Sequence, residues 1–467
     1  MKLNFKTKFS YGLIGIGDAA SYSFVGGFLL FFLITIAGIN PGIAGTIAAI
    51  GAVWDTISST FVGYISDGVN TRFGKRKPFL LISSFPLAIF MSLLFTAVEA
   101  SGLARIAYYV VMLMLFWTFF SLFFIPYLAW GAELVRDYHE RTVIRAYTSF
   151  FNLVGISIGI VLPVIIVDTL MGWGNSASQS WLYTGMFCGA VSALTIFFGA
   201  LGIKDKHEIE YSEKKSKHLS IPDMLRNYRE IIKLRTVKFI IAASVFYLIG
   251  YAVFFANRIY FLTYNAGLPA PHIAAVIFMM TFTSAMFVPV ITALNKRFDK
   301  KDIFIFGLGI SVSGMIVFGL VSATSLQALI LFALAYCLGG MCYWQLMPAM
   351  IYDVCEVDQL ANNKERAGLV ISLQSLAESV SNAAGLQLLG IILQFAGFNE
   401  GAEVQAANTL TWISLSFSII PAAFMGLAIV MIIKYPITKK THNRVLDALD
   451  RRNGGEAIDM TEFKNLI

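Results

Sequence analysis

The stretch that most restricts the fold is residues 54–81, WDTISSTFVGYISDGVNTRFGKRKPFLL. It begins in the middle of one long apolar segment, crosses a short loop rich in Lys and Arg, and enters a second apolar segment. A bilayer core of about 30 Å needs about 20 apolar residues per helix, and segments of this length recur along the chain. The sequence therefore predicts an all-α membrane protein that crosses the bilayer many times.

The composition supports this fold class. The 467 residues are 57% hydrophobic and 13% charged, and their mean hydropathy is +0.72. A water-soluble domain of this length cannot bury so much apolar surface. Twelve spans are predicted at 10–37, 42–66, 78–98, 105–132, 147–168, 181–202, 237–264, 271–294, 302–322, 326–352, 367–395 and 407–433.

The spans divide into two halves. We expect a six-helix bundle in residues 1–202 and a second in 237–433, joined by a polar loop at 203–236 that contains a surface helix. Lys and Arg are concentrated in alternate loops, in the central loop and in the tail 434–467, which share one side of the membrane. The positive-inside bias places that side in the cytoplasm. We expect an inner-membrane protein with both termini cytoplasmic. Its net charge of +7 follows from this topology, so no nucleic-acid partner is implied.

The two halves also resemble each other weakly. Span 4 passes Pro126 and ends in an acidic and basic segment that begins at Glu133, and span 10 passes Pro348 and ends in a similar segment from Asp353. Parallel six-span repeats with pseudo-symmetry are typical of major facilitator transporters, whose substrate site lies near the middle of the membrane.

Asp55 is the leading candidate for a cation site. It lies about twelve residues into its span, roughly 18 Å deep at 1.5 Å per residue. An ionisable group at that depth is costly unless it faces a wet cavity or a cation. Ser58 and Ser59 share its helix face, and Ser121 on span 4 could join them. The alternative is a buried Asp satisfied by neighbouring hydroxyl groups.

Several polar and aromatic side chains at mid-span are candidates for substrate binding. Asp18 with Tyr22 and Glu378 with Gln374 each lie one helical turn apart, and an aromatic stripe on span 10 could stack against a sugar. Arg258 could pair with a substrate carboxylate or extend to the membrane surface. Interhelical packing is the alternative for the others. The predicted substrate-binding set is Asp18, Tyr22, Tyr127, Asn257, Arg258, Tyr343, Trp344, Gln374 and Glu378.

Charged residues at the cytoplasmic ends of spans are candidates for a gate, because alternating access requires contacts that form in one state and break in the other. The predicted gating set is Asp67, Arg72, Lys75, Arg76, Glu133, Arg141, Glu365 and Arg366. The alternative is that they only determine topology. The sequence contains no P-loop, no nucleophile triad and no metal-spaced cluster, and its four cysteines lack ligand spacing, so we expect neither an enzyme nor a cofactor.

Three segments carry a family resemblance: residues 54–81, residues 125–142 (IPYLAWGAELVRDYHERT) and residues 361–368 (ANNKERAG). In them the chain is similar to the glycoside-pentoside-hexuronide:cation symporters, which include bacterial melibiose permeases. The resemblance implies a twelve-span major facilitator fold and sugar uptake driven by Na⁺, Li⁺ or H⁺. It places Asp55 on a cation-binding carboxylate and Asp18 within one residue of a sugar-binding one.

The chain departs from the melibiose branch at several functional positions. The second helix-II carboxylate is replaced by Ser59, and the helix-IV carboxylate by Phe124. The sugar-binding arginine of helix V aligns near Thr148, and the lysine of helix XI near Ser379. These departures argue against a galactoside substrate and leave the coupling ion open.

The sequence thus predicts a monomeric symporter for a sugar, glycoside or hexuronide that works by alternating access. H⁺ is the favoured coupling ion, because one carboxyl group in a low-dielectric cavity suits reversible protonation. A Na⁺-coupled or uncoupled carrier of the same substrates, or a transporter of lysolipids, is the alternative.

The predicted topology can be tested at Ser216 in the central loop. In Ser216→Cys, the introduced thiol should react with an impermeant reagent only after the cells are opened, because the loop is cytoplasmic. The unsubstituted chain is the control for its own cysteines. Labelling of the variant above that control in intact cells would contradict the predicted orientation.

Overall fold

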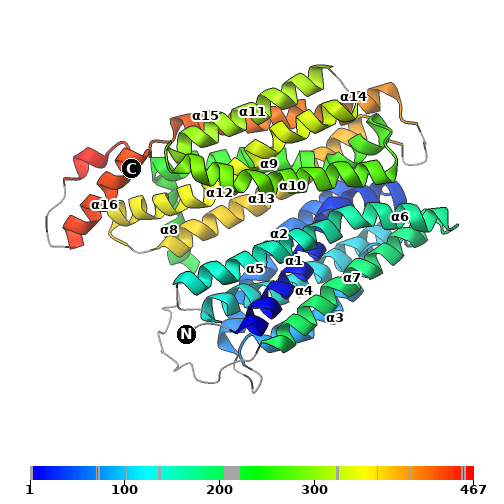
Figure 1. Cartoon of the computed structure of the whole chain (residues 1–467), viewed down its shortest axis with the longest axis horizontal. Helices are drawn as coiled ribbons and strands as arrows, with labels where there is room; N and C mark the ends of the chain where they lie inside the picture. Colours follow the sequence, from blue (N-terminus) through cyan, green and yellow to red (C-terminus); the bar gives the residue numbers. More distant parts are fainter. Residues whose placement is uncertain are drawn as a thin grey trace. The chain divides into compact units, whose positions relative to one another are not determined.

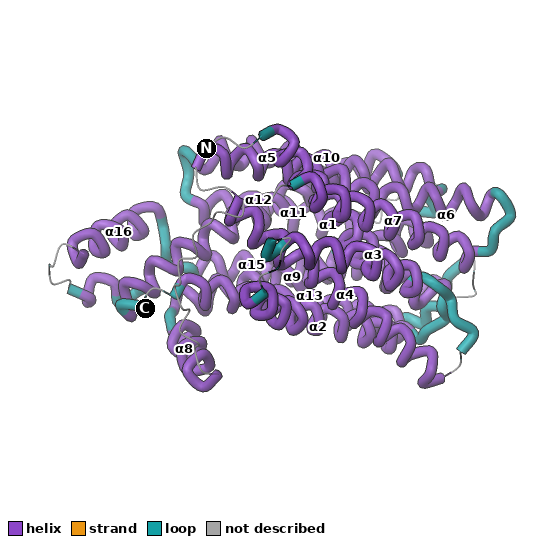
Figure 2. Tube along the Cα trace, turned by 90° about the horizontal axis from the view of Figure 1, so that it is seen from below, coloured by secondary structure: helices purple, strands orange, loops and turns teal. Residues whose placement is uncertain are grey.

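Helices account for every predicted span. The computed structural model describes residues 4–466 apart from 70, 72–73, 101, 135–137, 204–220, 322–324, 365, 400–401, 403, 454–455 and 457–458. The described residues form α-helices, short π-helical and 3-10 turns and no β-strand (Figure 1; Figure 2). An all-α membrane fold is what the sequence predicts.

The helices of the first part are α1 (Phe5–Phe31), η1 (Phe32–Ile36), α2 (Pro41–Gly68), α3 (Lys77–Leu94), α4 (Gly102–Leu134), α5 (Tyr138–Ile156), η2 (Ser157–Val161), α6 (Leu162–Gly172) and α7 (Ala177–Gly202). Those of the second part are α8 (Ile221–Lys233), α9 (Arg235–Tyr260), η3 (Phe261–Asn265), α10 (Ala270–Asn295), α11 (Lys300–Val321), α12 (Leu326–Asn362), α13 (Ala367–Phe395), α14 (Ala407–Phe417), α15 (Ile419–Lys434), α16 (Lys439–Asn453) and η4 (Met460–Phe463).

Eleven stretches of the described chain are long and apolar enough to cross a membrane, and each overlaps a predicted span. The remaining predicted span, 42–66, corresponds to α2, which is 28 residues long but polar at its centre around Asp55. The number twelve therefore stays a prediction. α12 continues past its predicted end at 352 to Asn362, where Asn363 adopts a left-handed conformation and ends the helix.

An internal repeat appears in the backbone. α1 and α9 both end in a five-residue π-helical turn, η1 and η3. Each turn is followed by a glycine with positive φ, Gly38 at 61° and Gly267 at 57°, which lie 229 residues apart. The backbone hydrogen bond from Ile39 to Leu33 has a counterpart at the same separation, from Leu268 to Leu262. Two stretches of sequence that share these local features support the predicted repeat.

The chain forms two compact units, which group its segments differently from the two predicted halves. Unit 1 contains Met1–Tyr211, Phe255–Thr281 and Leu386–Ile413. Unit 2 contains Ser212–Phe254, Phe282–Gly385 and Ser414–Ile467.

Unit 1 is built around α1, which packs against α5 and α7, while α3 packs against α4 and α7, and α2 against α4. A Cβ atom at Gly155 would lie 2.6 Å from the carbonyl oxygen of Ile16, and one at Gly159 would collide with the backbone of Ala20. Glycine therefore lets α5 and η2 approach the backbone of α1 closely.

Unit 2 contains α11 packed against α12 and α15, and α16 packed against α12. Both views place α8 and α16 near the same end of α12 (Figure 1; Figure 2). The helix predicted within the central loop is α8. Tyr228 of α8 and Ser372 of α13 share a hydrogen bond of 2.8 Å, and the backbone N–H of Thr236 donates to the carbonyl of Leu466.

An ionic network joins α8 to the loop between α12 and α13. The Arg366 guanidinium donates two hydrogen bonds to Asp358, at 2.8 and 3.0 Å, and one of 2.8 Å to Glu230. Lys364 also donates to Glu230. Hydrogen bonds from Arg366 and then Lys364 lower the pKa of Glu230 to about 2, so this carboxylate stays ionised through the neutral range.

Arg366→Met should lower the stability of the purified protein strongly. The side chain of Asp358 is 1% exposed, and loss of one partner from a buried ion pair costs about 3–5 kcal/mol. Arg226→Met is the matched control, because the Arg226 side chain is 81% exposed beside Glu230 and a surface pair is worth less than about 1 kcal/mol. Equal decreases of the melting temperature in the two variants would contradict this role of Arg366.

Candidate functional site

The central helix of unit 1 has one open polar stripe. Most of α1 is buried, but Asp18 is half-buried, Tyr22 is 48% exposed, and Gly26 has open space in place of a side chain. The four-residue spacing puts these three positions on the same face. The structure therefore places the predicted residues Asp18 and Tyr22 side by side along an otherwise packed helix.

Aromatic side chains of α4 border this stripe. The ring of Tyr22 lies 5.8 Å from that of Trp117 and 5.9 Å from that of Phe120. Tyr127, which the sequence predicts to bind substrate, is 1% exposed and stacks on Tyr11 at 4.6 Å. Each of these two tyrosines donates its hydroxyl hydrogen to the backbone carbonyl of the other. Tyr127 thus holds α1 against α4 in this conformation.

The four residues predicted to bind the coupling cation meet in one cluster. The hydroxyl of Ser121 on α4 donates to Asp55 Oδ1 at 3.2 Å, and its oxygen lies 2.8 Å from Ser58 Oγ and 3.0 Å from Ser59 Oγ. Ser121 is fully buried and lies at the centre of the cluster. The cluster offers one carboxylate and three hydroxyl groups, which can hold a proton or an alkali cation.

Sequence reasoning missed several polar residues near these helices. Trp54 Nε1 donates to Thr118 Oγ1 at 2.9 Å, which adds a second bond between α2 and α4 next to the Asp55 cluster. Thr118 lies three residues before Ser121, which puts both on one face of α4, and this spacing was the sequence signal for the contact. On α5, the side-chain oxygen of Asn152 lies against Gly15 and has no hydrogen-bond partner within the described chain.

Unit 2 contains a second polar cluster, centred on Ser244 of α9. Ser244 Oγ lies 2.6 Å from the hydroxyl of Tyr343 on α12, and Gln374 of α13 donates to Ser244 Oγ at 2.5 Å. The ring of Tyr343 stacks on that of Tyr247 with a centroid distance of 3.7 Å. Ser244, Tyr247 and Tyr251 were missed, although their spacing puts them on one face of α9.

Trp344 and Glu378 are the accessible members of this region. Trp344 is 41% exposed and meets the rings of Tyr251 and Tyr343 edge to face, at 5.6 and 5.3 Å. Glu378 is half-buried, one turn after Gln374, and forms no hydrogen bond within the described residues. Tyr251 and the buried Tyr343 therefore fix the orientation of an indole ring that remains partly exposed.

Asn257 and Arg258 lie at the end of α9 that belongs to unit 1. Asn257 is fully buried and donates to the carbonyl of Ile413 at 2.7 Å. Arg258 is 7% exposed, and its guanidinium carbon lies 4.6 Å from the ring centroid of Phe255. In this conformation Arg258 is buried against an aromatic ring and does not extend to the surface.

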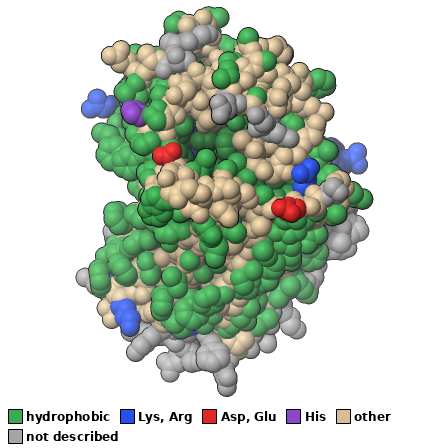
Figure 3. Space-filling model, turned by 90° about the vertical axis from the view of Figure 1, so that its right-hand side faces the viewer, with side chains coloured by type: hydrophobic (Ala, Val, Ile, Leu, Met, Phe, Trp, Pro, Cys, Tyr) green, Lys and Arg blue, Asp and Glu red, His purple; other side chains and the backbone are tan. Residues whose placement is uncertain are grey.

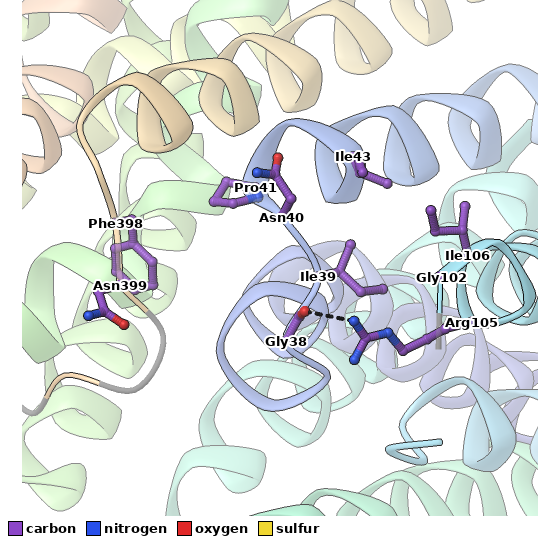
Figure 4. A pocket seen from close by; sticks show the side chains of 10 residues that line it. All are labelled: Gly38, Ile39, Asn40, Pro41, Ile43, Gly102, Arg105, Ile106, Phe398 and Asn399. Atoms are coloured by element: carbon purple, nitrogen blue, oxygen red, sulfur yellow. Dashed lines mark hydrogen bonds between the residues drawn. The ribbon is translucent and has the colours of Figure 1, made fainter. Parts of the chain in front are cut away.

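A cavity of about 500 Å³ opens in unit 1 where α1, α2 and α4 meet the segment after α13, and none of the predicted site residues lines it. Arg105 reaches across from α4 and donates to the carbonyls of Ala37 and Gly38, at 3.0 and 3.2 Å (Figure 4). Asn40 and Asn399 also line this cavity.

Charged side chains are sparse on the face drawn in Figure 3, where hydrophobic side chains predominate.

The structure describes part of the predicted gating set. Arg76 is 6% exposed and donates to Ser66 Oγ at 3.0 Å, and Arg366 binds Asp358 and Glu230 as described above. Lys75 is half-buried. Arg72 and Glu365, and the side chains of Asp67, Glu133 and Arg141, lie outside the described residues. Asp358, which binds Arg366, was missed.

Known proteins resemble this chain over almost its whole length. The glucuronide carrier protein homologue of Escherichia coli (strain K12) is 25% identical, over 97% of this chain and 96% of its own. The isoprimeverose transporter of Lactiplantibacillus pentosus is 23% identical, over 96% and 92%. A crystal structure of a D-xylose-proton symporter shares the fold with a TM-score of 0.64 at 14% identity, covering 93% of this chain and 98% of that one.

These similarities confirm the expected kind of protein, a membrane transporter and not an enzyme. The resemblance noted in the sequence extends from the first span to the last. The sequence model described as MFS/sugar transport protein matches residues 10–439, and the chain therefore belongs to this family of membrane transporters.

Proposed function

We propose that the protein is an H⁺-coupled symporter for a sugar, glycoside or hexuronide that works by alternating access in the inner membrane, as a monomer of two six-helix halves with both termini cytoplasmic. The observation that carries the proposal is the cluster of Asp55, Ser58, Ser59 and Ser121, a carboxylate surrounded by hydroxyl groups in the middle of a span. This cluster lies on α2 and α4, near the polar stripe of α1.

The geometry of the cluster supports H⁺ over Na⁺. Ser121 Oγ lies 2.8 to 3.2 Å from an oxygen atom of each of the other three side chains, which are hydrogen-bond distances. Oxygen atoms that bind one metal cation surround the ion and are kept apart by it. In this cluster Ser121 Oγ instead forms hydrogen bonds directly with the other oxygen atoms. A Na⁺ site at the same residues would require these hydroxyl groups to separate.

The groups proposed for the substrate suit a polyhydroxylated ring. Trp344 offers a partly exposed aromatic ring, and sugars place apolar C–H groups against the faces of such rings. The carboxylates of Asp18 and Glu378 can accept hydrogen bonds from sugar hydroxyls, and hydrogen bonds to charged groups are stronger than those between neutral groups. A glucuronide carrier protein homologue and an isoprimeverose transporter among the relatives support the same substrate class.

Asp55→Asn should abolish concentrative uptake while leaving exchange of bound substrate. The amide keeps the shape of the side chain but cannot gain and release a proton. Uptake into proteoliposomes under an imposed pH gradient should decrease to the level without a gradient, and counterflow should persist. Asp168→Asn, which changes an exposed residue of α6, is the matched control. Accumulation driven by a Na⁺ gradient alone at fixed pH, or full concentrative uptake by the Asn variant, would contradict H⁺ coupling at Asp55.

Asp18→Asn and Glu378→Gln should each weaken substrate binding without unfolding the protein, because neither amide leaves a void. The loss of a charged hydrogen-bond partner predicts an affinity roughly 10 to 100 times lower. The substrate is first identified by thermal stabilisation of the purified protein across sugars and glucuronides, since a ligand of the folded state raises its apparent stability. Glu99→Gln in an exposed loop is the control. Affinity equal to that of the unsubstituted protein in both variants would place the substrate site elsewhere.

A further inference from the structure

A long apolar groove follows α11 and α12 in unit 2. It has a volume of about 770 Å³, and Ser313 is the one polar side chain among the described residues that line it. Large apolar residues along it are strongly exposed: Phe306 at 67%, Val317 at 59% and Leu331 at 69%. Exposed apolar area of this kind, on helices apolar enough to span a membrane, implies an apolar occupant.

Glycine residues shape this groove. A Cβ atom at Gly314 would lie 2.7 Å from Cβ of Ala335, so α11 and α12 come close together there. The hydroxyl of Ser311 strengthens this contact by donating to the carbonyl of Ala335 at 2.5 Å. A Cβ atom at Gly309, in contrast, would meet nothing within 4 Å. Gly309 therefore leaves an open notch in the wall of the groove.

One end of the groove is basic. Lys301 lies one turn before Ile305 on the same face of α11, and its ammonium group donates to the carbonyls of Ile433 and Tyr435. Lys300 is paired with Asp353. Lys296 and Arg297, just before α11, are exposed and form no ion pair within the described residues. The nearby acidic groups are Asp299 and Asp302, so the end as a whole stays positive.

We propose that the groove binds an acyl chain of an anionic phospholipid whose phosphate lies against Lys296 and Arg297. An apolar channel with cations at one end matches a molecule that has a hydrocarbon chain and one negative headgroup. A helix of a second copy would fill the apolar part but would leave these cations unpaired.

Native mass spectrometry of the detergent-purified protein can test this assignment. The protein is incubated with phosphatidylglycerol or phosphatidylcholine of identical acyl chains, and the retained lipids are counted. The unsubstituted protein should retain phosphatidylglycerol preferentially. Lys296→Gln combined with Arg297→Gln should reduce that preference by about 30-fold, because each cation near an anionic lipid contributes separately. Lys233→Gln combined with Lys238→Gln, two exposed cations elsewhere, is the matched control.

The groove itself is tested with Gly309→Leu, whose Cβ atom would meet nothing within 4 Å and whose side chain should lower retention of phosphatidylglycerol severalfold. Gly426→Leu on α15 is its control, because Gly426 also has nothing within 4 Å. Melting temperatures of both variants are measured to check that they fold. Equal retention of the two lipids by the unsubstituted protein, or unchanged retention by Gly309→Leu, overturns the proposal. A two-chain species that Gly309→Leu dissociates also overturns it, because the groove would then be an interface between copies.

Discussion

A bilayer offers no hydrogen-bond partners, so every polar group inside it must find one within the protein. Helices meet this requirement for the backbone, and many hydroxyl groups follow the same rule by donating to the carbonyl one turn earlier, as Ser83 does to Phe79 and Thr184 to Ser180. Ser121 and Ser244 instead bond to side chains of other helices. Each is the centre of one candidate cluster, in which the partner of a hydroxyl group comes from another helix.

The sequence predicts helices well here because spans are long and apolar and each must bond its own backbone. It also predicts the Asp55 cluster, since three of its four members share one helix face. It fails where neighbours come from distant segments. Ser244 is the centre of its cluster only because Tyr343 of α12 and Gln374 of α13 contact it. Tyr127 was predicted to bind substrate but is buried against Tyr11. Such contacts depend on how the helices pack, which local patterns do not contain.

The ends of α1 and α9 share a backbone pattern, but the side chains at corresponding positions agree only in part. A separation of 229 residues relates Gly38 to Gly267, and the same separation relates Tyr22 to Tyr251 but Asp18 to Tyr247. Asp55 corresponds by the same count to Ser284. At these positions the first half carries Asp18 and Asp55 where the second carries Tyr247 and Ser284.

The π-helical turns at the ends of α1 and α9 have a consequence for helix register. A π turn closes its hydrogen bonds one residue later than an α turn. Since each residue of an α-helix turns the chain by about 100° and advances it by about 1.5 Å, conversion of η1 or η3 to regular α-helix would rotate the adjoining helix about its own axis by that angle. Asp18 and Tyr22 point outward from α1, so such a screw motion would change what they face without any tilt of the helix.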